Sequence, residues 1–170
     1  MQLDDQRKYL QRATDLAEYA LTQGSNPIGA VIVNSNGEII SEGYNEIKII
    51  NDVTAHGEIV ALRKAGKQVM KKFNPSPTYL FTTLEPCFAC GFFVTRTNIQ
   101  HIVWALDDPY NGGINFLKDT HKLMDAFKNI VLTSEPFEDL RKRSQDLTRK
   151  WYEDKNEFKI AKFFTDSDAR

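Results

Sequence analysis

Residues 28–44 read IGAVIVNSNGEIISEGY, and this stretch predicts the type of sheet. It holds two short runs of strand-forming residues, Ile28–Asn34 and Glu38–Tyr44, on either side of Asn36-Gly37. An Asn-Gly pair between two such runs is a strong signal for a two-residue hairpin turn. The sequence therefore predicts an antiparallel β-hairpin close to its N-terminal end.

Helices and strands alternate on both sides of this hairpin. Before it, apolar residues at helical spacing predict a helix over residues 6–23, capped by Asp4 or Asp5. After it we expect a loop over residues 46–53, then strands over 78–83, 99–106 and 130–133, and helices over 55–65, 87–97, 114–127 and 137–155. A hairpin followed by such alternation predicts an α/β fold with a mixed five-stranded sheet and helices on both faces.

Composition excludes several classes of protein. The 170 residues are 41% hydrophobic and 26% charged, as in an ordinary globular domain. Lys and Arg number 22 against 23 Asp and Glu, a balance that argues against a dedicated nucleic-acid binder. No apolar run approaches the roughly 20 residues that span a bilayer. Residues 1–12 are polar and charged, unlike a secretory signal, so we expect a cytoplasmic protein.

Two short motifs carry chemical information. The first is His56-Gly57-Glu58, and the second is Pro86-Cys87-Phe88-Ala89-Cys90. Both are expected where a helix begins, and two cysteines three residues apart on one turn can point at one ion. A catalytic zinc site has three protein ligands and leaves its fourth position to water. His56, Cys87 and Cys90 supply three ligands of the right type, and Glu58 is placed to accept a proton from that water.

Other interpretations of the cysteines remain open at this point. A lone C-x-x-C motif is also found in thioredoxin-like redox proteins, and buried cysteines can act as small hydrophobic residues. The two cysteines are too few and too close together for a disulfide framework. The joint order H-x-E followed by P-C-x-x-C is much more specific, because it is the signature of zinc deaminases.

With these motifs, the sequence resembles the cytidine deaminase superfamily of zinc hydrolases, in the branch of cytosine, guanine and tRNA adenosine deaminases. Residues 26–33 (NPIGAVIV), 43–45 (GYN) and 82–87 (TTLEPC) add to the resemblance. It implies a three-layer α/β/α domain over residues 1–158 with a tail over 159–170, and one Zn²⁺ per subunit. It also implies homodimers, base contacts from Asn45 and the backbone of Gly57, and hydrolysis of a base amine to a carbonyl with release of ammonia.

The C-terminal helix bears on the substrate. Its Trp151-Tyr152-Glu153-Asp154 resembles a stretch of fungal cytosine deaminases, which implies that Trp151 packs on the base and Asp154 accepts from its amine. Tyr110 falls where that family has an aromatic clamp. Ala55, where the cytosine enzymes have a bulkier residue, points instead to a larger base. Trp151 as a simple core anchor of the helix is the alternative.

These patterns predict a zinc-dependent aminohydrolase with a free nucleobase of the cytosine or guanine type as its small-molecule substrate. A tRNA-specific adenosine deaminase is the alternative, for which Lys159 and Lys162 are candidate phosphate contacts. A pseudo-deaminase with a structural zinc ion is a third hypothesis. Glu58 argues against the third, since a structural site has no need of a general base.

Overall fold

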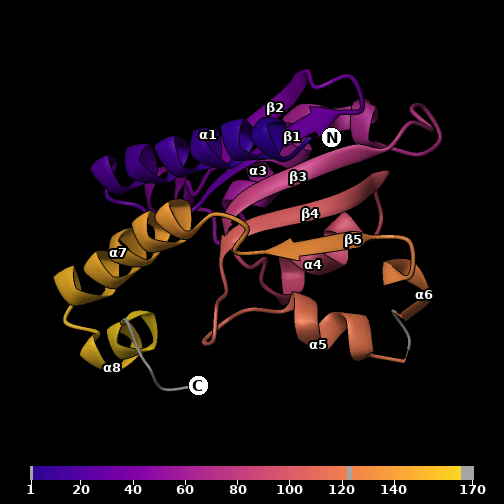
Figure 1. Ribbon diagram of the computed structural model, residues 1–170. Helices are drawn as coiled ribbons and strands as arrows, with labels where there is room; N and C mark the ends of the chain where they lie inside the picture. Colours follow the sequence, from indigo (N-terminus) through magenta and orange to yellow (C-terminus); the bar gives the residue numbers. More distant parts are fainter. Residues whose placement is uncertain (1, 122–123, 166–170) are drawn as a thin grey trace.

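The sheet of the computed structural model has five strands in the order β2-β1-β3-β4-β5 (Figure 1). The structure describes residues 2–121 and 124–165. Its strands are β1 (Gly29–Asn34), β2 (Ile39–Tyr44), β3 (Thr78–Leu84), β4 (Ile99–Leu106) and β5 (Val131–Ser134). β1 is antiparallel to both neighbours, β2 and β3, whereas β3, β4 and β5 run parallel. The predicted mixed five-stranded sheet is confirmed.

Helices cover both faces of this sheet, as expected for three layers. They are α1 (Leu3–Thr22), α2 (Ile47–Ile50), α3 (Gly57–Ala65), α4 (Phe88–Val94), α5 (Ile114–Asp119), α6 (Met124–Phe127), α7 (Glu138–Asp154) and α8 (Phe158–Ala161), with 3₁₀ turns at Gly66–Val69 and Lys162–Phe164. α1 and α7 lie side by side on one face, while α3, α4 and α5 lie on the other (Figure 1). Within the described residues, none of the helices has the length and hydrophobicity needed to cross a lipid bilayer.

Alternating side chains of the strands build a core on each face. In β1, Ala30 and Ile32 pack with Ala61 of α3, whereas Val31 and Val33 pack with Leu10 of α1. Successive side chains of a strand point to opposite faces, so a strand covered on both sides is apolar throughout. This is why β1 reads as a continuous hydrophobic run instead of an alternating one.

The hairpin turn is longer than the two residues expected. β1 ends at Asn34 and β2 begins at Ile39, and the backbone N–H of Asn34 donates to Glu38 O. Gly37 has φ of +85°, and the register shifts between Ile32 and Val33. A three-residue loop with glycine in the left-handed region is a common hairpin connection, whereas the register shift lies further along β2, at Ile40. The Asn-Gly signal located the turn correctly but gave the wrong length.

Other expected boundaries differ as well. The predicted helix over 114–127 is divided into α5 and α6, because Thr120 after α5 is extended (ψ 118°). The predicted loop over 46–53 contains the short helix α2. α1 begins at Leu3, so Asp4 and Asp5 lie in its first turn instead of capping it, where carboxylates complement the helix dipole.

Strand directions bring the sequence motifs to one edge of the sheet. Because β3 and β4 are parallel and β1 is antiparallel to β3, the beginning of β1, the end of β2 and the ends of β3 and β4 meet there. The backbone N–H of Asn45, after β2, donates to Ile28 O, just before β1, over 2.8 Å. Loops at this edge lead into the two sequence motifs, His56-Gly57-Glu58 and Pro86–Cys90.

Candidate zinc and catalytic site

The three predicted zinc ligands lie where two helices begin. His56 is the residue before α3, Cys87 is the residue before α4, and Cys90 lies within the first turn of α4. His56 Nδ1 and Cys87 Sγ are 3.7 Å apart, and the three candidate ligand atoms all lie within 4.8 Å of one another. Within residues 2–121 and 124–165, this is the one group of three or more such side chains placed to share a metal ion.

Burial and mutual contact give these ligands their ionisation states. The Cys90 thiol and then the His56 ring stabilise the Cys87 thiolate, which lowers the pKa of Cys87 to about 4. The same contact with Cys87 raises the pKa of His56, and contact with Cys87 together with burial raises the pKa of Cys90. A thiolate, a second thiol and an imidazole in one pocket are the donors that Zn²⁺ prefers, so the residues fit the metal.

Glu58 is almost fully buried beside this cluster. Its side chain is 3% exposed, and its Oε2 accepts from Cys90 Sγ over 3.5 Å. Burial disfavours the carboxylate and raises the pKa of Glu58 to about 7. A carboxyl group with a pKa near neutrality exchanges protons readily at physiological pH, as a general acid–base group requires. Glu58 thus has the placement and the environment expected of the proton-transfer residue.

Close backbone packing holds Glu58 against the sheet. Gly43 of β2 lies so near α3 that a Cβ there would come within 2.3 Å of Gly57 O. No larger residue fits without moving α3 away from β2. Gly57 in turn packs on Tyr44 and Ile28, because a Cβ at Gly57 would lie 3.0 Å from Ile28 O. The predicted substrate residues Asn45 and Gly57 therefore lie next to the start of α3, where His56 is located. Asn45 is 1% exposed.

A loop after β4 closes against the cysteine turn, and it carries Tyr110. Cys87 and Gly112 form an isolated β-bridge, and the backbone N–H of Gly113 donates to Pro86 O over 3.0 Å. Tyr110 is 49% exposed, with its ring centroid 5.8 Å from that of Phe163. The structure places Tyr110 on the loop next to Cys87, at the surface.

Glu85 is a structural residue of this region to which sequence reasoning gave no role. Its Oε1 accepts the backbone N–H groups of Ile114 and Asn115 over 3.0 and 3.2 Å, at the start of α5. Burial raises the pKa of Glu85. This carboxyl group ties α5 and the Tyr110 loop to the cysteine turn. An acidic residue directly after a mostly buried strand was the signal that could have found it.

The predicted C-terminal substrate residues lie in two different environments. Trp151 is buried, and Lys155 Nζ sits 4.0 Å from its ring centroid. Asp154 is exposed, and its Oδ2 accepts from Lys150 Nζ over 2.9 Å. The structure thus places Asp154 in a surface ion pair, whereas Cys90 and Glu58 are buried and His56 and Cys87 are half-buried beside them. The base-binding roles of Trp151, Asp154 and Tyr110 stay predictions.

The segment after Glu157 folds back on its own chain. Phe164 is buried with Ile28, Leu84 and Leu106, at the edge of the sheet that holds the site. Its ring stacks on Tyr152 with centroids 5.8 Å apart. Residues 158–164 therefore cover one side of the site edge, and residues 166–170 lie outside the described part of the chain.

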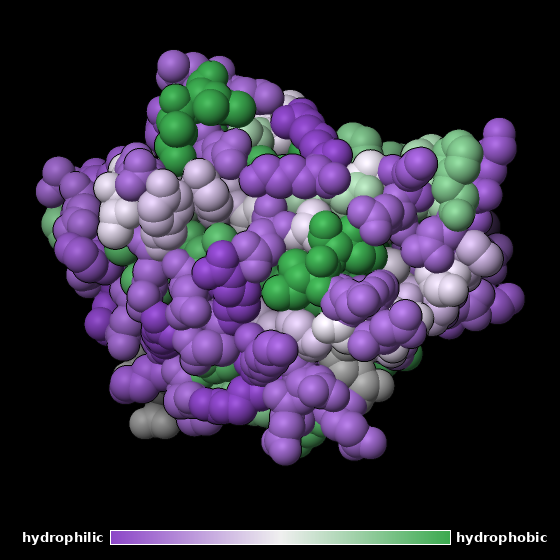
Figure 2. Space-filling model, turned by 90° about the horizontal axis from the view of Figure 1, so that it is seen from above, coloured by the Kyte–Doolittle hydropathy of each residue, from purple (hydrophilic) through white to green (hydrophobic). Residues whose placement is uncertain are grey.

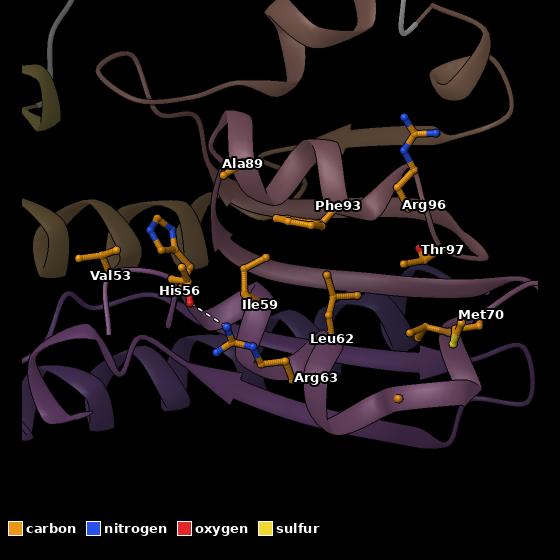
Figure 3. Close-up of a pocket in the computed structure, with 13 residues that line it drawn as sticks. Val53, His56, Ile59, Leu62, Arg63, Met70, Ala89, Phe93, Arg96 and Thr97 are labelled. Carbon is orange, nitrogen blue, oxygen red and sulfur yellow. Dashed lines mark hydrogen bonds between the residues drawn. The ribbon is translucent and has the colours of Figure 1, made fainter. Parts of the chain in front are cut away.

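An apolar groove of about 610 Å³ opens beside His56, between α3 and α4 (Figure 3). Ile59 and Leu62 of α3 face Ala89 and Phe93 of α4 across it (Figure 3). At its rim, Arg63 Nη2 donates to Thr54 Oγ1 over 2.7 Å. Of the three candidate zinc ligands, His56 lines this groove.

Two curated proteins with similar sequences are named as tRNA-specific adenosine deaminases. The chain is 33% identical over 106 residues to the tRNA-specific adenosine deaminase of Aquifex aeolicus, covering 62% of this chain and 69% of that protein. It is 36% identical over 107 residues to the enzyme of that name from Haemophilus influenzae, covering 63% and 61%. The matched part of the chain thus spans 69% of the length of the first relative and 61% of the length of the second.

Solved structures give the same fold. A structure from a study of A-to-I editing by tRNA:A34 deaminases at the wobble position aligns with a TM-score of 0.67 and 25% identity, over 83% of this chain and 99% of that one. A guanine deaminase from Nitrosomonas europaea aligns with a TM-score of 0.69, at 18% identity, over 84% and 82%. At that identity the second likeness concerns the fold alone.

A family model joins these observations. The cytidine and deoxycytidylate deaminase zinc-binding region matches residues 3–106, which include His56, Glu58, Cys87 and Cys90. The resemblance noted from the motifs, the zinc cofactor and the class of zinc-dependent aminohydrolase are confirmed. The chain belongs to the cytidine and deoxycytidylate deaminase zinc-binding family.

Proposed function

We propose that this protein is a hydrolytic deaminase that converts adenosine to inosine in tRNA. Its relatives at 33% and 36% identity are named as tRNA-specific adenosine deaminases, and this favours the alternative stated above over the free nucleobase. The observation that carries the deamination chemistry is the buried Glu58, with its pKa near 7, in contact with the His56–Cys87–Cys90 cluster.

Separate residues would bind the metal, transfer protons and orient the base. His56, Cys87 and Cys90 would hold the zinc ion, which when bound supplies a water molecule activated for attack on the ring carbon bearing the amine. Glu58 would take one proton from the attacking water and deliver it to the ring nitrogen. It would then take the proton of the newly formed hydroxyl group and deliver that one to the amine, which departs as ammonia while the carbonyl forms. Asn45 and the Gly57 backbone would orient the base. Burial excludes competing water from Glu58, so each proton stays with the reacting groups.

A free nucleobase of the cytosine or guanine type is the second candidate, and the charges of α7 favour it. Arg149 pairs with Asp146 and Glu153, and Lys150 pairs with Asp154. Basic residues neutralised by their own helix contribute little to binding RNA phosphates. Lys159 and Lys162, both exposed, are the candidate phosphate contacts outside α7.

One experiment separates the two candidates. Zinc-loaded protein is incubated with an anticodon stem-loop carrying adenosine at the wobble position, and in parallel with free adenine, guanine and cytosine. Inosine in the RNA, falling steeply with added salt, is the expected result. A stem-loop with guanosine at that position is the matched control. Ammonia from a free base without inosine would establish the second candidate instead, and no product from any substrate would contradict the deaminase assignment.

We also propose that the protein is cytoplasmic. We propose further that two copies associate through the face around the α3/α4 groove. Most of the side chains that line the groove are apolar, and Phe93 among them is 52% exposed (Figure 3). The ring centroid of Phe93 is 5.9 Å from that of Phe92, which is also exposed. Figure 2 shows another face, which is mostly hydrophilic with separate hydrophobic patches. Exposed apolar patches such as the one around Phe93 mark interfaces. A two-fold axis would place this patch against the same patch of the second copy.

Sedimentation tests this assembly. Phe93→Glu is expected to convert a dimer to a monomer, because a charge would be buried in the interface. Val131→Glu is the matched control, since Val131 is also 52% exposed but lies on the edge strand β5. A wild-type monomer, or a Phe93→Glu dimer, would contradict the proposal.

A further inference from the structure

Ser25 and Asn45 form a buried polar pair beside the site. Ser25 Oγ donates to Asn45 Oδ1 over 2.7 Å, and both residues are at most 1% exposed. Ser25 lies in the loop between α1 and β1, and Asn45 follows β2. Burying a hydroxyl and a carboxamide away from water costs folding free energy unless both groups form hydrogen bonds inside the protein.

The chemistry of the donors fixes which way the carboxamide of Asn45 faces. Its Oδ1 also receives the backbone N–H of Ile47 over 3.3 Å. A backbone N–H can only donate, so the atom that faces it must be the oxygen and not the nitrogen. With its oxygen engaged by Ser25 and Ile47, Asn45 is left with its Nδ2 group as the donor for any further partner.

This pair is attached directly to the segment that carries the catalytic residues. The backbone N–H of Asn45 donates to Ile28 O over 2.8 Å, three residues after Ser25. Ile28 O and Tyr44 also form the surface on which Gly57 packs, and Gly57 lies between His56 and Glu58. The orientation of Asn45 is therefore set within the same packed layer as the ligand and the general base.

We propose that Ser25 is a positioning residue that fixes the polarity of Asn45, so that the site presents an N–H₂ donor to the base. Such a donor selects heterocycles with an acceptor at that edge, a ring nitrogen with a free lone pair or a carbonyl oxygen. The proposal rests on the proposed function in taking a base as the substrate. It adds to that function a residue that touches Asn45 and not the substrate.

Ser25→Ala tests this directly. It removes the hydroxyl donor, and we expect KM for the adenosine-containing stem-loop to rise about tenfold, with kcat changed less than threefold and zinc content unchanged. Ser41→Ala is the matched control, because Ser41 Oγ also makes a buried hydrogen bond, to Ala61 O over 2.8 Å, and not to Asn45. Its KM is expected to stay within twofold of wild type.

A double-mutant cycle separates positioning from a general effect on the fold. In an Asn45→Ala background, Ser25→Ala is expected to add no further loss, since the group that it positions is gone. A tenfold KM effect that persists in that background would overturn the proposal. So would a Ser25→Ala variant whose KM stays within twofold of wild type.

An NMR measurement that does not depend on enzymatic activity tests the role of Ser25 separately from the proposed function. The side-chain ¹⁵N–¹H₂ resonances of Asn45 are expected to shift in Ser25→Ala and to stay in place in Ser41→Ala. If wild-type protein deaminates no base, the proposed function fails while this measurement still decides the role of Ser25. Unchanged Asn45 resonances in Ser25→Ala would overturn it.

Discussion

The start of α3 and α4 and the C-terminal region after β5 place their polar groups in opposite ways. In the first, Glu58 is buried and in contact with Cys90, and His56 contacts Cys87. In the second, the charged side chains of α7, such as Asp154, lie at the surface in ion pairs. The family match ends at residue 106, so it includes the first region and not the second. The candidate zinc ligands and Glu58 thus lie within the family match, whereas the predicted base contacts Tyr110, Trp151 and Asp154 lie outside it.

The largest effect is expected at the buried ligands. Cys90→Ser removes one thiol from a three-ligand site, so the variant is expected to lose most of its zinc and at least about a thousandfold in turnover. Ala89→Ser places the same residue one position earlier on the same helical turn and is the control. Metal analysis of both purified variants is the measurement. A Cys90→Ser protein with full zinc content would contradict the assignment of Cys90 as a zinc ligand, and with it the contrast between the two regions.

The C-terminal region is expected to contribute stability through its apolar side chains. Phe164→Ala removes a buried ring that packs on Ile28 and Leu84, and should lower the free energy of unfolding by about 4 kcal/mol. Phe163→Ala, one residue earlier at a half-exposed position, should cost about 1 kcal/mol or less. Urea unfolding of the two variants checks this, and equal losses would contradict the observed packing.

The buried carboxyl group predicts a pH dependence of stability in chelator-treated protein. Burial raises the pKa of Glu58 from 4.5 to about 7, so the folded chain holds this proton more tightly than the unfolded chain. Stability from this source is therefore present below pH 4.5 and is lost as pH rises to 7, by about 3 kcal/mol. Wild type minus Glu58→Gln, compared at pH 5 and pH 7.5, isolates it. A constant difference would mean that burial does not perturb Glu58.

The smallest effect is expected at Asp154. Its ion pair with Lys150 is exposed, and such pairs contribute about 0–1 kcal/mol. From this geometry, Asp154→Asn should leave kcat/KM within twofold of wild type. A loss of tenfold or more would show that Asp154 reads the base amine after all, as the resemblance to fungal cytosine deaminases implies. Glu153→Gln, the neighbouring acid on α7, is the control.

Sequence alone predicted the sheet and the metal ligands because both depend on local, specific patterns. The run at β1, the Asn-Gly turn and the H-x-E and P-C-x-x-C motifs each carry their meaning within a few residues. It did not predict the role of Glu85, because that role follows from contacts with the start of α5, 29 residues away. Ser25 was missed for the same reason: nothing near it in the sequence indicates that it would meet Asn45, 20 residues away.

The turnover and zinc content of Glu58→Gln, measured on one sample, test the central claim most directly. If His56, Cys87 and Cys90 hold the metal and Glu58 moves the proton, the variant keeps one zinc ion per chain and loses at least about a hundredfold in deamination. Wild-type protein of equal zinc content is the reference. Deamination within tenfold of wild type, or zinc lost together with activity, would contradict this division of roles.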